Sequence, residues 1–424
     1  MRSLTTRRAA AILAGTATLL LGARPLAAQR PDAPPLTVTG AMALARANHP
    51  ALAAASARRV AAVGAARQDA ALPNPMLEWR QENVGSPLRP DRFLTVSQPL
   101  DLTGRRRALR AEVGLIDERA VADSATVARE VEAAAARAYW RTSLALALLD
   151  VAATQRADAE RLACVEGDRA REGAVAGLVA MRADVEAQRA RLVEATARAE
   201  WERARAALAS ATGLAADALP PIPPMTLSSR SSTPLPTVDA TRAAALERRS
   251  DLAALRAGVE GAERRRSAER RAVLPDVSLQ LGTMQSAGYT ARTVGVAVPI
   301  PLLDRNAGGR ARAAGALRIA EAELRAAENT AHAEAVAAAE ALSALLAVGG
   351  PGADSLVARA AEVARVADAA YAEGGLTLLE LLDARRAHAE ALTTALRWSA
   401  ELRLARLELN RVSGATLTES LEMP

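Results

Sequence analysis

The chain has 424 residues, enough for two or three ordinary domains, but its composition is unlike that of a compact enzyme. Half of the residues are hydrophobic, yet only 2% are aromatic. Phe, Tyr and Trp normally fill much of an enzyme core, whereas alanine-rich and arginine-rich sequence favours long, closely packed helices. No lysine is present, so arginine carries all the positive side of the formal net charge of +6.

The N-terminal segment is typical of an export signal. Three arginines among the first eight residues precede an apolar stretch at 9–23, and Ala27-Ala28 offers a cleavage site. We therefore expect residues 1–28 to be a signal peptide, because the stretch is too short for a convincing membrane helix. The segment holds four arginines and no acid, so its removal lowers the net charge from +6 to +2. A charge of that size gives no reason to expect a nucleic-acid partner.

Residues suited to bond chemistry are sparse. The only cysteine, Cys164, falls deep in a helical segment, where we expect a small, buried residue. The three histidines, His49, His332 and His388, have no carboxylate or cysteine at metal-ligand spacing. The sequence also lacks a phosphate loop and a nucleophile elbow. We therefore expect no enzyme activity, no cofactor and no resident metal.

The sequence repeats itself at a spacing of about 200 residues. Five markers recur in the same order: Asn48-His49-Pro50 and Arg249-Ser250, Leu72-Pro73 and Leu274-Pro275, Gln98-Pro99 and Val298-Pro299, Glu172-Gly173 and Glu373-Gly374, and Thr212-Gly213 and Ser413-Gly414. Because all five keep an offset of 200 to 202 residues, we predict an internal duplication, with a first repeat at 29–216 and a second at 237–424. The Pro/Ser-rich residues 217–236 are expected to form an extended linker.

Both repeats predict the same order of elements. A helix (38–71 and 237–272) is followed by two strands, by a very long helix broken by glycines (104–171 and 304–372), and by a return helix (177–212 and 376–413). The strands are expected at 76–83 and 93–101, and at 277–285 and 291–300. The run Gly349-Gly350-Pro351-Gly352 is expected to break the second long helix.

The strand candidates alternate between apolar and polar residues. In the third strand, Val277, Leu279 and Leu281 share one face, while polar and small residues occupy the other. A half-buried sheet in a soluble domain gives the same alternation, but no sheet core is evident for these strands to join. Strands of this length can cross a bilayer when tilted, although four of them cannot close a barrel and an open edge cannot lie in hydrocarbon. Three chains would supply twelve strands.

Three of the eight aromatic residues fall in or beside these strands, namely Trp79, Phe93 and Tyr289. Aromatic side chains gather at the interfaces between membrane and water, so we expect these three to form part of such a girdle.

The long helices carry small apolar residues on several faces. Residues 111–163 alone would span on the order of 75–80 Å as a helix. Such a rod cannot bury itself within one chain, and small side chains allow the close approach that a tube of packed helices requires. The alternative is a periplasmic coiled-coil scaffold or adaptor protein without a transport function.

Two local strings carry a resemblance to a known family. Residues 97–106 (SQPLDLTGRR) and 298–306 (VPIPLLDRN) resemble the two strand-to-helix junctions of the TolC family of outer-membrane efflux proteins. They are most similar to its cobalt–zinc–cadmium (CzcC-like) branch, and Asn74-Pro75 and Glu82-Asn83 agree with it. The resemblance covers essentially the whole chain after the signal segment.

The resemblance implies a mainly α protein with a small β part. Three copies would form a 12-stranded outer-membrane β-barrel, continued into the periplasm by an α-barrel of long antiparallel helices. It also implies a passive exit duct, coupled through a periplasmic adaptor (membrane fusion) protein to an inner-membrane pump of the resistance-nodulation-division type. The branch favours heavy-metal cations as cargo, but ducts of this architecture also pass drugs and secreted proteins, so the sequence leaves the cargo open. The adaptor would meet the helix turns, which are here Gly173, Ala174 and Val175, and Gly374, Gly375, Leu376 and Thr377. The alternative is that these residues only serve the tight helix reversal, which requires glycine at a positive φ.

The resemblance further implies a periplasmic gate made of two acidic rings. Glu380 and Asp383 match the acidic residues that line the family's constriction, and their i, i+3 spacing places both on one helix face. The alternative for these two acids is a solvated helix face, paired with Arg385 or Arg386. Family members can hold the closed end with an arginine near the turn, but Leu376 stands at that place, so other contacts are expected to act here.

Overall fold

The computed structural model describes residues 34–417, apart from 86, 88, 228–235 and 274–275. The predicted signal peptide and part of the predicted linker lie outside these residues. The elements of the first half are α1 (Val38–Asn48), α2 (Pro50–Ala70), β1 (Met76–Glu82), β2 (Asp91–Leu100), α3 (Arg105–Arg171), α4 (Gly177–Thr212) and the short 3₁₀ helix η1 (Ala216–Ala218). Those of the second half are α5 (Val238–Arg248), α6 (Ser250–Arg271), β3 (Val277–Ser286), β4 (Tyr289–Ala297), α7 (Ala307–Ala372) and α8 (Leu378–Ser413).

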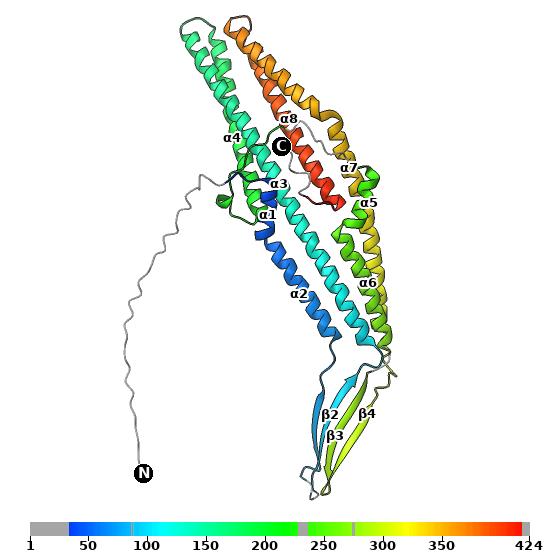
Figure 1. Cartoon of the computed structure of the whole chain (residues 1–424). Helices are drawn as coiled ribbons and strands as arrows, with labels where there is room; N and C mark the ends of the chain where they lie inside the picture. The colour runs from blue at the N-terminus through cyan, green and yellow to red at the C-terminus, as the bar shows by residue number, and fades with distance from the viewer. Residues whose placement is uncertain (1–33, 86, 88, 228–235, 274–275, 418–424) are drawn as a thin grey trace, which may run out of the picture. The chain divides into compact units, whose positions relative to one another are not determined.

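The two halves have matching elements of nearly equal length. The long helices α3 and α7 have 67 and 66 residues, and the return helices α4 and α8 have 36 each. Figure 1 shows the four strands side by side at one end of α2, α3, α6 and α7, and the α3–α4 and α7–α8 turns at the opposite end. The predicted duplication of elements is confirmed, as is a mainly helical fold with a small antiparallel sheet.

Two predicted helices are each divided in two. The expected helix at 38–71 breaks at His49, whose φ of −71° and ψ of 124° are extended, because Pro50 restricts the residue before it. The expected helix at 237–272 breaks in the same way at Arg249, with φ −69° and ψ 125°. No proline follows Arg249, so the sequence signal for this second break is missing.

The predicted interruption of the second long helix is wrong, because α7 is continuous through residues 349–352. The glycines inside α3 do not break that helix either. An interior glycine costs only about 1 kcal/mol relative to alanine, and an interior proline about 3 kcal/mol. Buried residues on both sides of the run, Leu342 before it and Ala364 and Ala367 after it, hold α7 in the helix bundle. We infer that this packing outweighs the local cost.

Helix contacts in the core rely on small side chains. The largest buried cluster joins α1, α3, α4 and α8, and Ala41, Ala133 and Ala136 in it are completely inaccessible to solvent. The prediction that Cys164 is buried is wrong, because this residue is exposed. It lies on the outer side of α3, while its neighbours Ala159 and Leu162 face the interior.

Each return helix ends where the first helix of its repeat is broken. Gly213 and Gly414 follow α4 and α8 with φ of +72° and +75°, the left-handed conformation that glycine adopts without cost. A Cβ added at Gly213 would lie 2.9 Å from the carbonyl oxygen of Asn48, and one at Gly414 would lie 2.6 Å from the Cβ of Arg248. Both glycines therefore allow a close approach between a helix end and a helix break.

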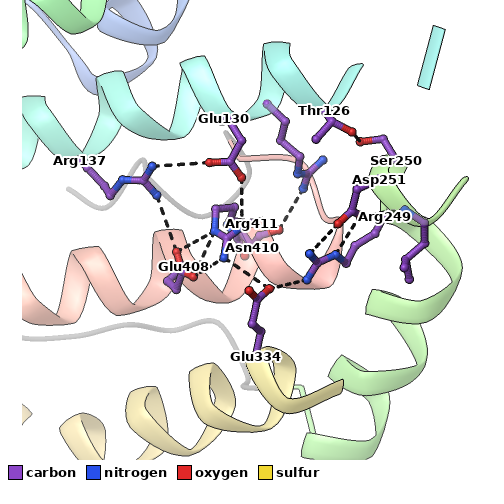
Figure 2. A network of polar contacts seen from close by, with 12 residues as sticks. Thr126, Glu130, Arg137, Arg249, Ser250, Asp251, Glu334, Glu408, Asn410 and Arg411 are labelled. Carbon is purple, nitrogen blue, oxygen red and sulfur yellow. Dashed lines mark hydrogen bonds and ion pairs between the residues drawn. The ribbon is translucent and has the colours of Figure 1, made fainter. Parts of the chain in front are cut away.

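A network of ion pairs lies beside the break at Arg249 (Figure 2). Arg249 donates to Asp251 at 2.7 Å and to Glu334 of α7 at 2.6 Å. Arg411 of α8 is 2.7 Å from Glu408 and 3.0 Å from Glu130 of α3. The pKa of Glu408 lies below its usual value, mainly because its carboxylate accepts a hydrogen bond from Arg411. Since these charges come from both repeats, the network ties the two halves together.

Candidate functional site

The sheet is a single antiparallel layer in the order β1-β2-β3-β4. Its central pair joins the two repeats, because β2 pairs with β3 over nine residues, from Arg92 with Gln285 to Leu100 with Val277. The outer sides of β1 and β4 have no strand partner among the described residues. One chain therefore contributes a strip of sheet with two open edges.

The register places the aliphatic residues of all four strands on one face. Leu77 is opposite Val96, Val96 opposite Leu281, and Leu281 opposite Val294. The row beside it continues the same face from Gln98 through Leu279 to Val296. Leu77, Leu281 and Val294 are 67%, 51% and 76% exposed, so none of the described residues covers this face. The predicted alternation is confirmed in the rows through Leu281 and Leu279, whereas the next row on this face, from Trp79 and Leu94, becomes polar at Thr283 and Arg292.

The three predicted girdle aromatics do not share a face. Trp79 pairs with Leu94 on the apolar face and is 64% exposed. Phe93 pairs with Arg80 on the opposite face, where the guanidinium carbon lies 4.8 Å from the ring centre. Tyr289 pairs with Ser286, which is in register with that same polar face. Only Trp79 therefore shares a face with Leu77 and Leu281, and a membrane-interface role for the three aromatics stays a prediction.

The two helix turns have the geometry expected of tight reversals. Gly173 and Gly374 have φ of +75° and +78°, and nothing lies within 4 Å of a Cβ added at either. The amide of Ala174 donates to the carbonyl of Arg169 at 2.8 Å, and that of Gly375 donates to Ala370 at 2.8 Å. Ala174 and Thr377 are exposed, so both turns present backbone and small side chains to solvent. These properties suit a contact surface, which stays a prediction.

The ends of the two helix hairpins pack against each other. A buried cluster contains Leu162 of α3 and Ala183 of α4 together with Leu378, Leu381 and Leu382 of α8. Leu376 packs against this cluster as a partly buried residue. An apolar contact therefore stands at the position of Leu376, where the sequence has no arginine.

Polar contacts beside this cluster were not predicted from the sequence. Glu166 is fully buried and accepts from Arg169 at 3.0 Å, and Arg169 also donates to the Tyr371 hydroxyl at 3.4 Å. Burial, followed by the contact with Glu166, raises the pKa of Tyr371 to about 12. The tyrosine therefore stays protonated at neutral pH. No motif marks Glu166, because its role depends on α7 lying next to α3.

The two predicted gate acids are exposed residues of α8 in the single chain. Glu380 completes a capping box, in which its carboxylate accepts from the amide and the hydroxyl of Thr377, both at 2.8 Å. These hydrogen bonds hold the pKa of Glu380 below its usual value. Asp383 lies one turn further along. Arg385 instead contacts Asp368, and Arg386 contacts Glu186, so these arginines do not form ion pairs with the two acids among the described contacts.

Among the described residues, no group of three or more His, Cys, Asp or Glu side chains is arranged to hold a metal ion. One helix in this part of the chain, α7, is long and apolar enough to cross a membrane by length and composition alone. By itself this is weak evidence for a membrane span, because α7 packs along α6 and α8 in the helix bundle and buries residues against them.

Comparison with known proteins gives one similar sequence and several similar structures. The cobalt-zinc-cadmium resistance protein CzcC of Cupriavidus metallidurans is 29% identical over 291 residues. The aligned region is 66% of this chain and 66% of CzcC, just under two thirds of that protein's length. No family model matches the sequence.

The solved structures agree over most of the chain. The outer-membrane channel CmeC of Campylobacter jejuni has a TM-score of 0.73 at 15% identity, covering 91% of this chain and 87% of that one. The outer-membrane protein VceC of Vibrio cholerae has a TM-score of 0.72 at 20% identity, covering 90% and 96%. The chain has the TolC-family fold. The predicted resemblance to TolC-family channels, and to CzcC among them, is confirmed.

Proposed function

We propose that this chain is an outer-membrane channel that acts as the passive exit duct of an efflux system. The observation that carries the proposal is the one-sided apolar sheet with two open edges. An unpaired strand edge cannot remain in hydrocarbon, since each free N–H or C=O group costs several kcal/mol there. If β1 of one copy pairs with β4 of the next, three copies close a barrel of twelve strands. The helices then extend into the periplasm.

The helical part offers a surface for such packing between copies. A groove of about 910 Å³ runs along α3 and α4 and is lined by Leu144, Leu148, Val151 and Val193, with Arg137 and Glu200 beside them. In the single chain Val193 is 45% exposed. A neighbouring copy that filled this groove would bury its apolar side chains, which supports a homotrimer.

Likeness to CzcC supports a role in metal efflux. By its name that relative confers resistance to cobalt, zinc and cadmium. We therefore propose heavy-metal cations as the exported cargo, delivered by an inner-membrane pump of the resistance-nodulation-division type through a periplasmic adaptor protein. The adaptor would contact the exposed turns around Gly173 and Gly374. A duct needs no bond chemistry, so no enzyme activity is proposed.

The experiment that tests the proposal follows the full-length protein after export. We expect it in the outer-membrane fraction, as an oligomer that resists detergent until heated, and we expect the purified oligomer to conduct ions across a planar bilayer. A monomer recovered from the soluble periplasm would contradict the proposal and favour a scaffold or adaptor protein.

The gate at Glu380 and Asp383 is part of the same proposal. Repeated in three copies, the two acids would form rings that attract cations and repel one another. We expect the double variant Glu380→Gln/Asp383→Asn to weaken cation preference and to alter single-channel conductance in planar bilayers. Glutamine can keep the capping hydrogen bond to Thr377, so the variant removes charge without removing the cap.

A matched control for the gate is the variant Glu362→Gln/Asp368→Asn on α7. It removes the same number of charges near the same end of the helices. If the control changes selectivity as much as the gate variant does, or if the gate variant leaves selectivity and conductance unaltered, the assignment of the gate to these two acids is wrong.

A further inference from the structure

Between the sheet and the long helices, the chain exposes aliphatic side chains that belong to no strand. Leu102 lies between β2 and α3, while Ile300, Leu302 and Leu303 lie between β4 and α7. Their exposed fractions are 70%, 76%, 73% and 102%. These four residues lie within 101–107 and 298–306. We call these two segments, together with residues 269–273, the junction. The apolar character of the sheet thus continues past the last hydrogen-bonded residue, Ala297.

Contacts between elements bring the parts of the junction together. Arg271 at the end of α6 donates to the carbonyl of Gly104 at 2.9 Å. Asn306, just before α7, donates to the Glu269 carboxylate at 2.7 Å. The starts of α3 and α7 and the end of α6 therefore meet at one level of the chain, next to the helix end of the sheet.

Acidic groups at this level are already engaged within the junction. The Asp101 carboxylate accepts from the amides of Arg105 and Arg106, at 3.1 and 2.9 Å. Glu269 also lies 3.7 Å from Arg105, and Asp276 lies 3.7 Å from Arg106. These carboxylates neutralise the inner arginines of the junction and the helix start.

The outer arginines of the junction are left without such partners. Arg107 lies in α3, Arg270 in α6 and Arg305 in the loop before α7, and all three are exposed. None of the ion pairs found among the described residues involves them. Asp304, next to Arg305, has no ion pair among the described residues either, so three arginines and one carboxylate leave a band of net positive charge beside the exposed aliphatic side chains.

The position of these arginines along the strands agrees with the boundary between acyl chains and headgroups. The strands β3 and β4 have 10 and 9 residues, or about 30 Å at 3.3 Å per residue. A tilt of about 40° lowers their vertical span to about 23 Å, close to the apolar band of about 25 Å on outer-membrane barrels. Residues just beyond the strands would then lie where acyl chains meet headgroups.

From this arrangement we infer that the junction is a binding surface for anionic phospholipids of the periplasmic leaflet. Leu102, Ile300, Leu302 and Leu303 enter the acyl-chain boundary, while Arg107, Arg270 and Arg305 bind headgroup phosphates. Guanidinium groups suit phosphate because their planar N–H donors match its oxygens, and long side chains can keep their charge at the headgroup level. The inference rests on the proposed location in the outer membrane, and it adds the kind of lipid and the residues that recognise it.

The test compares phosphatidylglycerol with phosphatidylcholine as ligands of the purified oligomer in detergent. We expect phosphatidylglycerol to raise the thermal midpoint and to be retained in native mass spectra, and salt to weaken both effects. Each arginine near an anionic surface strengthens binding about fivefold. The variant Arg107→Gln/Arg270→Gln/Arg305→Gln should therefore need on the order of 100-fold more phosphatidylglycerol for the same thermal shift.

The control variant is Arg182→Gln/Arg189→Gln/Arg359→Gln, which removes three exposed arginines far from the junction. It should respond to phosphatidylglycerol as the parent protein does. Should the triple junction variant not assemble, Arg305→Gln alone, in a loop, should require about fivefold more lipid. Equal responses in junction and control variants would overturn the inference. So would equal stabilisation by phosphatidylcholine, or by inorganic phosphate at the same concentration.

A second measurement reports how deeply Leu303 lies in the membrane. In a Cys164→Ser background, Leu303→Cys labelled with an environment-sensitive fluorophore should shift to the blue in vesicles and be quenched by lipids brominated near the headgroup. An unshifted spectrum would place Leu303 in water and overturn the inference. If the parent protein conducts ions in bilayers but shows no preference for phosphatidylglycerol, only this inference fails. If the parent protein stays in the soluble periplasm, the proposed function itself fails.

Discussion

Replacing Leu281 by arginine is expected to lower the amount of assembled protein in the outer membrane by at least tenfold. Leu281 lies in the middle of the apolar face, between Val96 and Val294, and is 51% exposed. An arginine at the midplane of an outer-membrane barrel costs about 2–4 kcal/mol. A trimer would bear that cost three times. The measurement is the amount of detergent-resistant, heat-modifiable oligomer in purified outer membranes.

The adjacent residue provides the control. Gln280 pairs with Ser97 and Gly295 on the polar face, so Gln280→Arg adds the same charge at the same depth of the sheet. We expect near-normal assembly of this variant and a change in conductance, because its side chain would project into the lumen. Equal assembly of the two variants would mean that the apolar face does not meet lipid, and it would count against the membrane barrel.

Substituting Gly414 by alanine is expected to destabilise the helical part by about 2–5 kcal/mol. A left-handed conformation costs a residue with a Cβ roughly 1–2 kcal/mol, and overpacking adds about 1–3 kcal/mol. Both costs apply because φ is +75° and the new Cβ would lie 2.6 Å from that of Arg248. Gly213→Ala, at the matching place of the first repeat, should behave alike. Thermal unfolding of the purified protein, followed by circular dichroism, measures the loss.

Gly374→Ala separates the cost of the left-handed backbone from the cost of close packing. This glycine has nearly the same φ, +78°, but nothing lies within 4 Å of an added Cβ. We expect only the backbone cost, about 1–2 kcal/mol. If Gly374→Ala lowers the midpoint as much as Gly414→Ala, close packing at the helix break contributes nothing and the cost is conformational.

Several features of the molecule were accessible from local sequence signals. The strand alternation around Leu281 depends only on the two-residue period of a strand, so it could be read without knowing any partner. The turns at Gly173 and Gly374 depend on the backbone freedom of glycine, which is also local. For the same reason the order of elements in each repeat was predicted nearly completely.

Features that depend on packing between segments far apart in the sequence were missed or wrongly predicted. The break at Arg249 has no proline to announce it, and it coincides with the close approach of Gly414 and the ion pair with Glu334. The run at 349–352 looked like an interruption, but contacts of α7 on both sides of it favour a continuous helix. Cys164 looked buried because its sequence surroundings are helical, yet its side of α3 is exposed.

The sequence by itself determined the duplication, the helical and strand periods and the residues at each turn, since all of these follow from spacing along the chain. Only the tertiary structure decided that β2 pairs with β3 and unites four strands in one sheet. It also decided that Phe93 lies beside Arg80, and that Glu166 and Arg169 of α3 meet Tyr371 of α7. These outcomes depend on which distant segments meet. Loop-closure entropy and side-chain packing select that pairing, and neither is encoded in a local pattern.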